Sequence, residues 1–159
     1  MTHHEGMAIV KAEPEHVEAL RGRIRRGDYL ECSAFNPLDP EELVARSLAL
    51  SDHAWSWIVG GRVGAMFGVQ ADPARPKVGL VWMVSTPEVE KRPLFVAKQS
   101  VLFVNMMLKA FEQIEAVVDY RYAASLRWLG WLGFELGWPE PMGVDGELFY
   151  TARRRRGEV

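Results

Sequence analysis

Acidic and aromatic side chains are the residues of this sequence whose types and positions best suit proton transfer. Glu31, His53 and Asp119 could each accept a proton from a substrate. Asp119 ends a short apolar run at 116–119 that has the pattern of a strand, so we expect its carboxylate beside any cleft at the end of that strand. Tyr122 could donate a proton as a phenolic acid.

Each of these candidates also has an ordinary structural role. Asp119 could help to start the helix that follows it, and Glu31, in the run RGDYLEC, could be a surface carboxylate. Aromatic residues at the spacing of Tyr120 and Tyr122 more often pack in a core than take part in catalysis. The residue types alone leave these alternatives open.

Other catalytic systems lack their local signatures in this chain. No G-x-S-x-G elbow, G-x-x-x-x-G-K-[ST] loop, dinucleotide glycine fingerprint or H-E-x-x-H helix occurs. Cys32 is the only cysteine, which excludes an internal disulfide and a thiolate metal cluster and suits a reducing compartment. His3 and His4 lie near the start of the chain, where such pairs are mostly inert. We therefore predict no metal site and a cytoplasmic location.

Composition and charge narrow the class of protein. The 159 residues are 48% hydrophobic, and 19 basic against 21 acidic side chains leave a formal charge of -2. Such a balance does not favour nucleic acid or a membrane surface as the main partner. No apolar run approaches the roughly 20 residues that span a bilayer. Without repeats or linkers, we predict one domain over residues 1–159, with flexible ends at 1–6 and 154–159.

The sequence predicts strands and helices that alternate along the chain. Glycines at 60 and 61 predict a hairpin between two β-rich runs, since both tolerate positive φ. A nearly continuous apolar run at 78–86 predicts a central strand covered on both faces. The other expected elements are a strand at 8–10, a helix opening at 13–15 with RGDYLEC after it, a helix from 40 to about 50 that Asp39 caps, a loop at 71–76, a helix at 93–111, a strand at 116–119, a helix from 123 and closing strands near 134 and 149–151.

This order, β-α-α-β-β-β-α-β-α-β-β, resembles the GNAT (Gcn5-related N-acetyltransferase) fold, an α/β fold with a mixed, mostly antiparallel sheet flanked by helices. The run AASLRWLGWLGFEL, ending in Gly133-Phe134, is similar to the fourth-helix motif of that family. The runs DYRY, LRWL, SLALSDHAW and GGRVGAMFGV look like its phage-associated branch, which includes an internal virion protein of short-tailed coliphages.

The resemblance implies a site for acetyl-CoA, the family's acyl donor, between two diverging strands. The residues that it implies contact the cofactor are Met83, Val84, Ser85, Lys91, Arg92, Tyr122 and Arg127. The chain departs from the family at Pro93, because most members have a Gln or Arg with two glycines in the preceding loop. It also departs at Tyr122, usually Asn, and at Leu129, often a Tyr that protonates the leaving thiolate.

Our leading hypothesis is therefore a GNAT-type N-acyltransferase that transfers an acetyl group from acetyl-CoA to an unknown amine and is encoded by a phage or prophage. Glu31, Asp119 and Tyr122 are its candidate catalytic residues. The alternative is a non-catalytic GNAT-fold virion or assembly protein with a degenerate CoA site, and a third reading is a small-molecule binding domain. The partners considered are a small-molecule or protein amine, virion proteins and a second copy of the chain.

Overall fold

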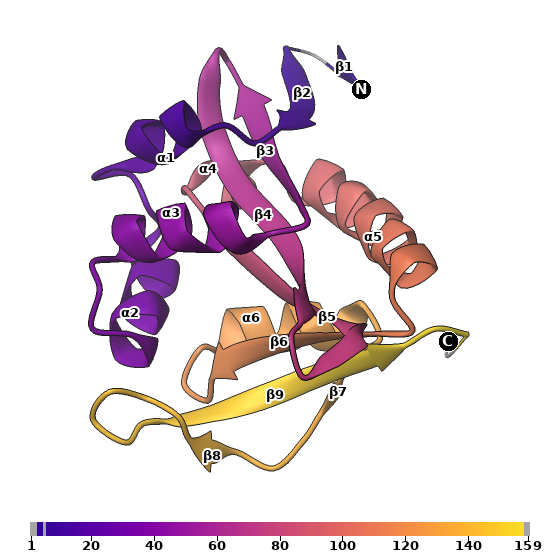
Figure 1. The fold of residues 1–159 in the computed structure, drawn as a ribbon. Coiled ribbons are helices and arrows are strands. Elements are labelled where there is room, and N and C mark those ends of the chain that lie inside the picture. The colour runs from indigo at the N-terminus through magenta and orange to yellow at the C-terminus, as the bar shows by residue number, and fades with distance from the viewer. Residues whose placement is uncertain (1–2, 5, 158–159) are drawn as a thin grey trace.

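The computed structural model describes residues 3–4 and 6–157. Its centre is a nine-stranded sheet in the order β1-β2-β3-β4-β5-β6-β9-β7, with β8 paired to β9 (Figure 1). The strands are β1 (His3–His4), β2 (Met7–Lys11), β3 (His53–Val59), β4 (Arg62–Asp72), β5 (Arg75–Ser85), β6 (Gln113–Asp119), β7 (Glu135–Leu136), β8 (Glu140–Pro141) and β9 (Leu148–Arg155). Only the β5 and β6 pair is parallel among these strands. The mixed, mostly antiparallel sheet confirms the predicted fold class.

Helices cover both faces of this sheet (Figure 1). The helices are α1 (Pro14–Leu20), α2 (Arg26–Phe35), α3 (Pro40–Leu50), α4 (Glu88–Lys91), α5 (Pro93–Ala110) and α6 (Ala123–Trp131). On one face, Leu20 of α1 and Val44 of α3 belong to the same buried cluster as Met66 of β4. On the other, Met107 of α5 and Leu129 of α6 cluster with β6. The sheet is therefore covered on both sides around β5, as its apolar run predicted.

The region after the first helix differs from the prediction. The helix ends at Leu20 and a separate helix, α2, begins at Arg26, so RGDYLEC is helical. Gly22, with φ of 74°, lies in the turn between them, in a backbone conformation that favours glycine. This turn lets the Arg25 N–H donate to the carbonyl of Ser85 at the end of β5 (2.7 Å). The predicted pair of helices before the hairpin is thus a set of three.

The two hairpins of the sheet were predicted with different success. Gly60 and Gly61 connect β3 to β4 with φ of 56° and 74°, which confirms the first hairpin. The loop expected at 71–76 is wrong, because β4 runs to Asp72 and β5 starts at Arg75. The Asp72 side chain accepts a hydrogen bond from the Ala74 N–H (2.9 Å), an Asx turn that shortens the connection.

The central pair of strands separates along its length. β5 and β6 pair only at Val78 with Gln113, Gly79 with Ile114 and Leu80 with Glu115. Beyond these pairs β5 continues to Ser85 beside β4, and β6 continues to Asp119 beside β9, with which it pairs along its whole length. The predicted break in pairing toward the C-terminal ends is confirmed, although β6 begins at Gln113 rather than at 116.

The ends of the chain carry more structure than the sequence predicted. β9 extends to Arg155, so residues 154 and 155 are paired with β6 rather than flexible. At the start, His3 and His4 pair with β2. The remaining parts of the predicted flexible ends at 1–2, 5 and 158–159 lie outside the described residues. In the described chain, no helix is both long and apolar enough to cross a membrane.

Candidate active site between strands β5 and β6

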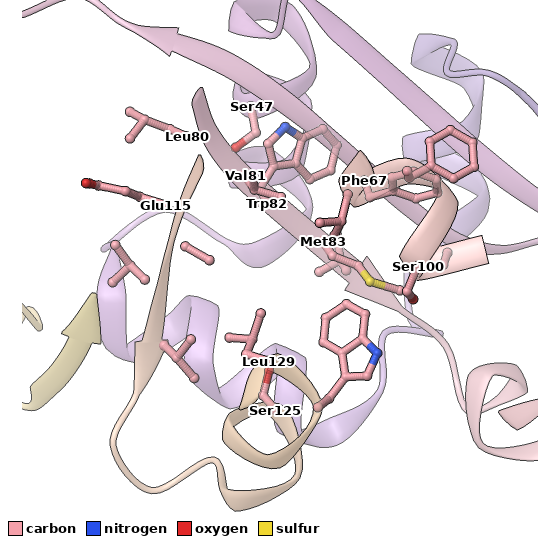
Figure 2. Close-up of a pocket in the computed structure, with 18 of the residues that line it drawn as sticks. Ser47, Phe67, Leu80, Val81, Trp82, Met83, Ser100, Glu115, Ser125 and Leu129 are labelled. Atoms are coloured by element: carbon pink, nitrogen blue, oxygen red, sulfur yellow. The ribbon is translucent and has the colours of Figure 1, made fainter. Parts of the chain in front are cut away.

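The gap between β5 and β6 opens into a cavity of about 600 Å³ (Figure 2). Figure 2 shows Val81 and Met83 on β5, Ser100 on α5 and Ser125 and Leu129 on α6 around it. A second cavity of about 240 Å³ adjoins the first, since both share lining residues from α2, β5, α5 and α6. The separation of the strands therefore produces a hollow where α2, α5 and α6 meet.

One edge of β5 offers backbone groups to this gap. The Thr86 N–H donates to the Gly64 carbonyl (2.9 Å), and in an antiparallel ladder such bonded positions alternate. The backbone groups of Val84 therefore point at β4, and those of Val81 and Met83 point into the gap. Of the three β5 residues expected to present free backbone groups, Met83 does so and Val84 does not.

Ser85, the third of those residues, is held by a carboxylate that the sequence analysis missed. Asp28 on α2 is buried, and its Oδ2 accepts hydrogen bonds from the Ser85 N–H and hydroxyl (both 2.7 Å). Its Oδ1 accepts from the Tyr122 hydroxyl (2.6 Å) and from Arg25 (3.0 Å). Asp28 lies three residues before Glu31, so recognising α2 as a helix would have placed both carboxylates on one face.

Glu31 is the candidate base that the structure places in the cavity walls. It lines both cavities, and its carboxylate accepts a hydrogen bond from the backbone N–H of Asp119 (3.0 Å). Burial raises the pKa of Glu31 to about 7, with smaller contributions from the negative charges of Asp28 and Asp119. A carboxylate with such a pKa can take a proton near neutral pH, which is the requirement for a general base.

Asp119, which had the strongest positional argument in the sequence, serves the structure differently. Its carboxylate is buried and binds Arg121 through the backbone N–H (2.9 Å) and the guanidinium (2.8 and 3.0 Å). These hydrogen bonds hold the pKa of Asp119 below its ordinary value. Asp119 does not line either cavity, and it contacts Glu31 only through its own backbone N–H.

Tyr122 precedes α6 and packs against α2. Its hydroxyl bonds Asp28, and the Arg25 guanidinium lies 5.5 Å from its ring centre. Gly27 permits this approach, because a Cβ there would come 2.5 Å from the ring. Burial, followed by the charge of Asp28, raises the pKa of Tyr122 above its ordinary value. The side chain is absent from the lining of both cavities.

The remaining predicted residues lie outside the cavities. His53 is exposed at the start of β3 and stacks on Trp55 (6.1 Å between ring centres). Lys91 ends α4 and pairs with Glu88 (3.1 Å), and Arg92 precedes α5. Arg127 is exposed on α6. The cation that does line the smaller cavity is Arg25, which is not among the residues predicted for the site.

The loop after β5 has an unusual local structure for a phosphate site. α4 occupies residues 88–91, and Pro93, which has no N–H, is the first residue of α5. No glycine lies between Ser85 and Pro93, so this segment departs from the glycine loop that the family resemblance implies. Within the described residues, no group of three histidine, cysteine or acidic side chains could hold a metal ion.

Comparisons with known proteins match this chain by fold. No protein-family model and no curated protein matches it. The GNAT-family acetyltransferase from Streptococcus pneumoniae is 15% identical, with a TM-score of 0.65 over 95% of this chain and 99% of that chain. The protein yncA from Salmonella typhimurium, solved with acetyl-CoA, is 14% identical, with a TM-score of 0.71 over 97% and 96%.

A third structure extends the likeness to another kind of acetyltransferase. The GNAT-superfamily phosphinothricin acetyltransferase from Sinorhizobium meliloti, solved with acetyl-CoA, is 16% identical, with a TM-score of 0.67 over 96% of this chain and 89% of that chain. At these identities the likeness shows the fold alone. The chain has the GNAT acyltransferase fold.

Proposed function

We propose that the protein is a GNAT-type N-acyltransferase that takes the acyl group from acetyl-CoA and passes it to an amine. The observation that carries this proposal is Glu31, a carboxylate with a pKa of about 7 in the wall of a cavity beside a free strand edge. A strand edge, an apolar cavity and a base are the parts that direct acyl transfer requires.

The residues around the gap suit the middle section of acetyl-CoA, which is its pantetheine arm. The backbone groups of Val81 and Met83 point into the gap, and those of Val81 together with the Met83 carbonyl would pair with the amides of the pantetheine arm. At the outer end, we propose that Lys91, Arg92 and Arg25 supply positive charge toward the pyrophosphate in place of glycine-loop N–H groups. Arg127, exposed on α6, remains a proposed contact on the strength of the family resemblance.

Among the protein's own groups, Glu31 and the edge of β5 would take part in the acyl transfer. Acetyl-CoA, when bound, supplies an acetyl group as a thioester, so that transfer forms an amide C–N bond, breaks the C–S bond and releases CoA as the thiol. Glu31 accepts the proton that the amine must lose. The Met83 N–H, held by a rigid strand, is positioned to stabilise a developing oxyanion in the gap.

A covalent route through the protein does not suit the one cysteine in the cavity wall. Burial raises the pKa of Cys32 to about 12, so its thiol stays protonated at neutral pH. A protonated thiol is a poor nucleophile. The direct attack of the amine on the thioester therefore needs no help from Cys32.

The proposal is tested by measuring release of the CoA thiol from acetyl-CoA with a panel of primary amines. We expect amine-dependent release in the wild-type protein and a loss of about 10²-fold or more in Glu31→Gln. Glu42→Gln, an exposed carboxylate on α3, is the matched control and should retain the wild-type rate. Equal rates in Glu31→Gln and Glu42→Gln would overturn the role of Glu31.

A second candidate function is a GNAT-fold protein that does not transfer acyl groups. The observation that favours it is the phosphate end of the gap, where Pro93 lacks an N–H and the Ser85 N–H is already taken by Asp28. The other support for this candidate is the resemblance of several short sequence runs to the phage-associated branch, which includes a virion protein. Saturable binding of acetyl-CoA with no thiol release for any amine would favour it.

We also propose that the protein works in the cytoplasm, of a phage-infected host if the phage resemblance holds. Support comes from Cys32, a free and partly buried thiol that suits a reducing compartment. The acceptor amine and any second copy of the chain are further proposals.

A further inference from the structure

The main cavity reaches both faces of the sheet through the gap between β5 and β6. On β5, Val81 packs against the buried cluster of α5 and α6, whereas Trp82 packs against the cluster of α1 and α3. On β6, Val118 belongs to the first cluster, so its neighbour Val117 points to the second face. All four residues line the cavity. The space therefore continues from the face that α5 and α6 cover to the face of α2 and α3.

On this second face, the cavity is bordered by apolar side chains that are not packed into a core. Leu80 of β5 (Figure 2), Val117 of β6, Phe35 of α2 and Leu43 of α3 line it. None of these four belongs to a core cluster of the described chain. Phe35 and Val117 are each 39% exposed. The four residues therefore border a space that solvent reaches, and this space is called the apolar hollow below.

The large rings around the apolar hollow are held away from its centre. The Trp82 indole N–H donates to the Ser51 hydroxyl (2.7 Å), and Nε1 lies over Gly68 of β4, where a Cβ would come 2.8 Å from it. Phe35 packs edge-on against Phe149 of β9, with 5.4 Å between ring centres. Because β4 and β9 flank the pair of β5 and β6, these two rings leave the space over the gap open.

The acidic residues that line the two cavities leave one carboxylate for an amine. Glu31 lines both cavities and forms no ion pair within the described chain. The other three acidic lining residues each bind an arginine. These pairs are Asp28 with Arg25 (3.0 Å), Asp72 with Arg75 (2.8 Å) and Glu115 with Arg75 (2.9 Å). One amino group can therefore be received at Glu31, and no free carboxylate remains for a second.

The arginines lie at the end of the hollow that is far from Glu31. Glu31 accepts a hydrogen bond from the Asp119 N–H, and Glu115 lies four residues earlier on β6. At about 3.3 Å a residue, these two positions are about 13 Å apart along the strand. Glu115 is bound by Arg153 (3.3 Å) as well as by Arg75. A second ammonium group at this end would meet two guanidinium groups and only carboxylates that already have partners.

We propose that the acceptor is a small primary monoamine with an apolar body, whose amino group meets Glu31 and whose body lies in the apolar hollow over Leu80 and Val117. This inference rests on the proposed function and deepens it, because it names the class of acceptor. The amine nitrogen forms the C–N bond as the C–S bond breaks, Glu31 takes the amine proton, and CoA is released as the thiol. Removal of the apolar body from water supplies the affinity.

The test is kcat/KM for acetyl transfer to ethylamine, butylamine and hexylamine, measured by release of the CoA thiol from acetyl-CoA. These amines have nearly the same basicity, so the series isolates the contribution of the body. Full burial of a methylene corresponds to about fourfold in kcat/KM. With incomplete burial, we expect hexylamine to exceed ethylamine by at least about 30-fold. Equal values along the series would overturn the inference and leave the proposed function intact.

A second comparison isolates the charge at the far end. Hexane-1,6-diamine has the body of hexylamine and a second ammonium group, and its kcat/KM should be lower by about tenfold or more. Preference for this diamine or for spermidine would overturn the inference, and so would release with the lysine or N-terminus of a peptide alone. Absence of thiol release with every amine would instead overturn the proposed function, and the inference with it.

A variant that fills the apolar hollow locates the body of the amine. Val117→Phe should reduce the preference for hexylamine over ethylamine by about tenfold or more. Val101→Phe makes the same change on α5 at a position of similar exposure (38%) that lines neither cavity, and it should keep the wild-type preference. An unchanged preference in a folded Val117→Phe protein would contradict the placement in the hollow. The wild-type series tests the inference without any variant.

Discussion

At the scale of single residues, the surroundings of two carboxylates, Glu31 and Asp119, shift their pKa values in opposite directions. Glu31 is poised to exchange a proton because burial raises its pKa, whereas Asp119 is locked in its charged form by Arg121. The sequence suggested both residues and favoured Asp119. The position of Asp119 at a strand end could be predicted from the apolar pattern, but the hydrogen bonds from Arg121 that keep Asp119 charged could not.

The first prediction concerns the pH dependence of Glu31. The rate of the wild-type protein should rise with pH through about 7, because Glu31 must be deprotonated to accept a proton. Glu31→Gln should lose this ionisation together with most of the rate. A pH–rate profile of kcat/KM in both proteins checks this expectation. The same wild-type ionisation in the variant would show that another group is the base.

The same pKa gives a second, independent prediction on stability. The pKa of Glu31 is raised from 4.5 to about 7, so between these values the folded state holds a proton that the unfolded state has lost. Stability must therefore fall as pH rises through this window. Relative to wild type, Glu31→Gln should gain stability, up to roughly 3 kcal/mol, between about pH 5 and pH 8. Urea denaturation at both pH values measures the difference, and a constant difference would contradict the raised pKa.

Tyr122 gives a prediction in which structure and chemistry separate. Tyr122→Phe removes one of the donors to buried Asp28, so we expect a loss of about 1 to 2 kcal/mol and a melting temperature lower by a few degrees. The rate of acyl transfer should change by less than about threefold. Tyr29→Phe, at an exposed position of α2, the helix that carries Asp28, is the control. A rate loss of about 10²-fold at unchanged stability would place the hydroxyl in the chemistry instead.

At the scale of elements, the structure differs from the sequence-based expectation where short polar segments were read as loops. The amphipathic and apolar patterns of α3, α5 and β5 were strong enough to predict these elements. α2 was missed because RGDYLEC has few apolar residues and begins with an arginine and a glycine. That omission hid Asp28 and the relation of Asp28 to Glu31, so the polar end of the site could not be assembled from the sequence.

An ion pair between Arg75 and Glu115, called the strand clamp below, joins β5 to β6 where the two strands begin to separate. Arg75, at the start of β5, makes two hydrogen bonds (both 2.9 Å) to Glu115 of β6, at the last paired position before the strands separate. Glu115 is buried and Arg75 is 49% exposed. Arg75→Met should lower stability at neutral pH, by an amount limited by solvent screening of Arg75 and by the remaining contact of Glu115 with Arg153.

The pH dependence of this clamp has a defined sign. The hydrogen bonds and charge of Arg75 hold the pKa of Glu115 below its ordinary value. The stability that this contributes is present above the unfolded pKa and is lost as pH falls through the folded pKa. The difference between wild type and Arg75→Met should therefore shrink toward about pH 4 in urea denaturation. Lys77→Met, which breaks the exposed pair with Glu112, is the control and should have little effect at either pH.

At the scale of the whole molecule, the fold could be predicted because element order and apolar patterning agree along most of the chain. The ligand site could not be predicted as fully, because its shape depends on where β5 and β6 stop pairing and on how α2 and α5 border the gap. Arg25 and Glu31 line the smaller cavity, and the larger one is lined by apolar side chains together with charged residues such as Glu31 and Glu115.

The measurement that tests this account most directly is a calorimetric titration of the purified protein with acetyl-CoA at low and high salt. We predict saturable binding at micromolar ligand at low salt, weakened by high salt because the phosphates are partly exposed. Ala at both Lys91 and Arg92 should weaken it about three- to tenfold, and Ala at Arg46 and Lys109, two exposed cations away from the gap, should not. No binding at millimolar acetyl-CoA would contradict the assignment of the β5 and β6 gap as an acyl-CoA site.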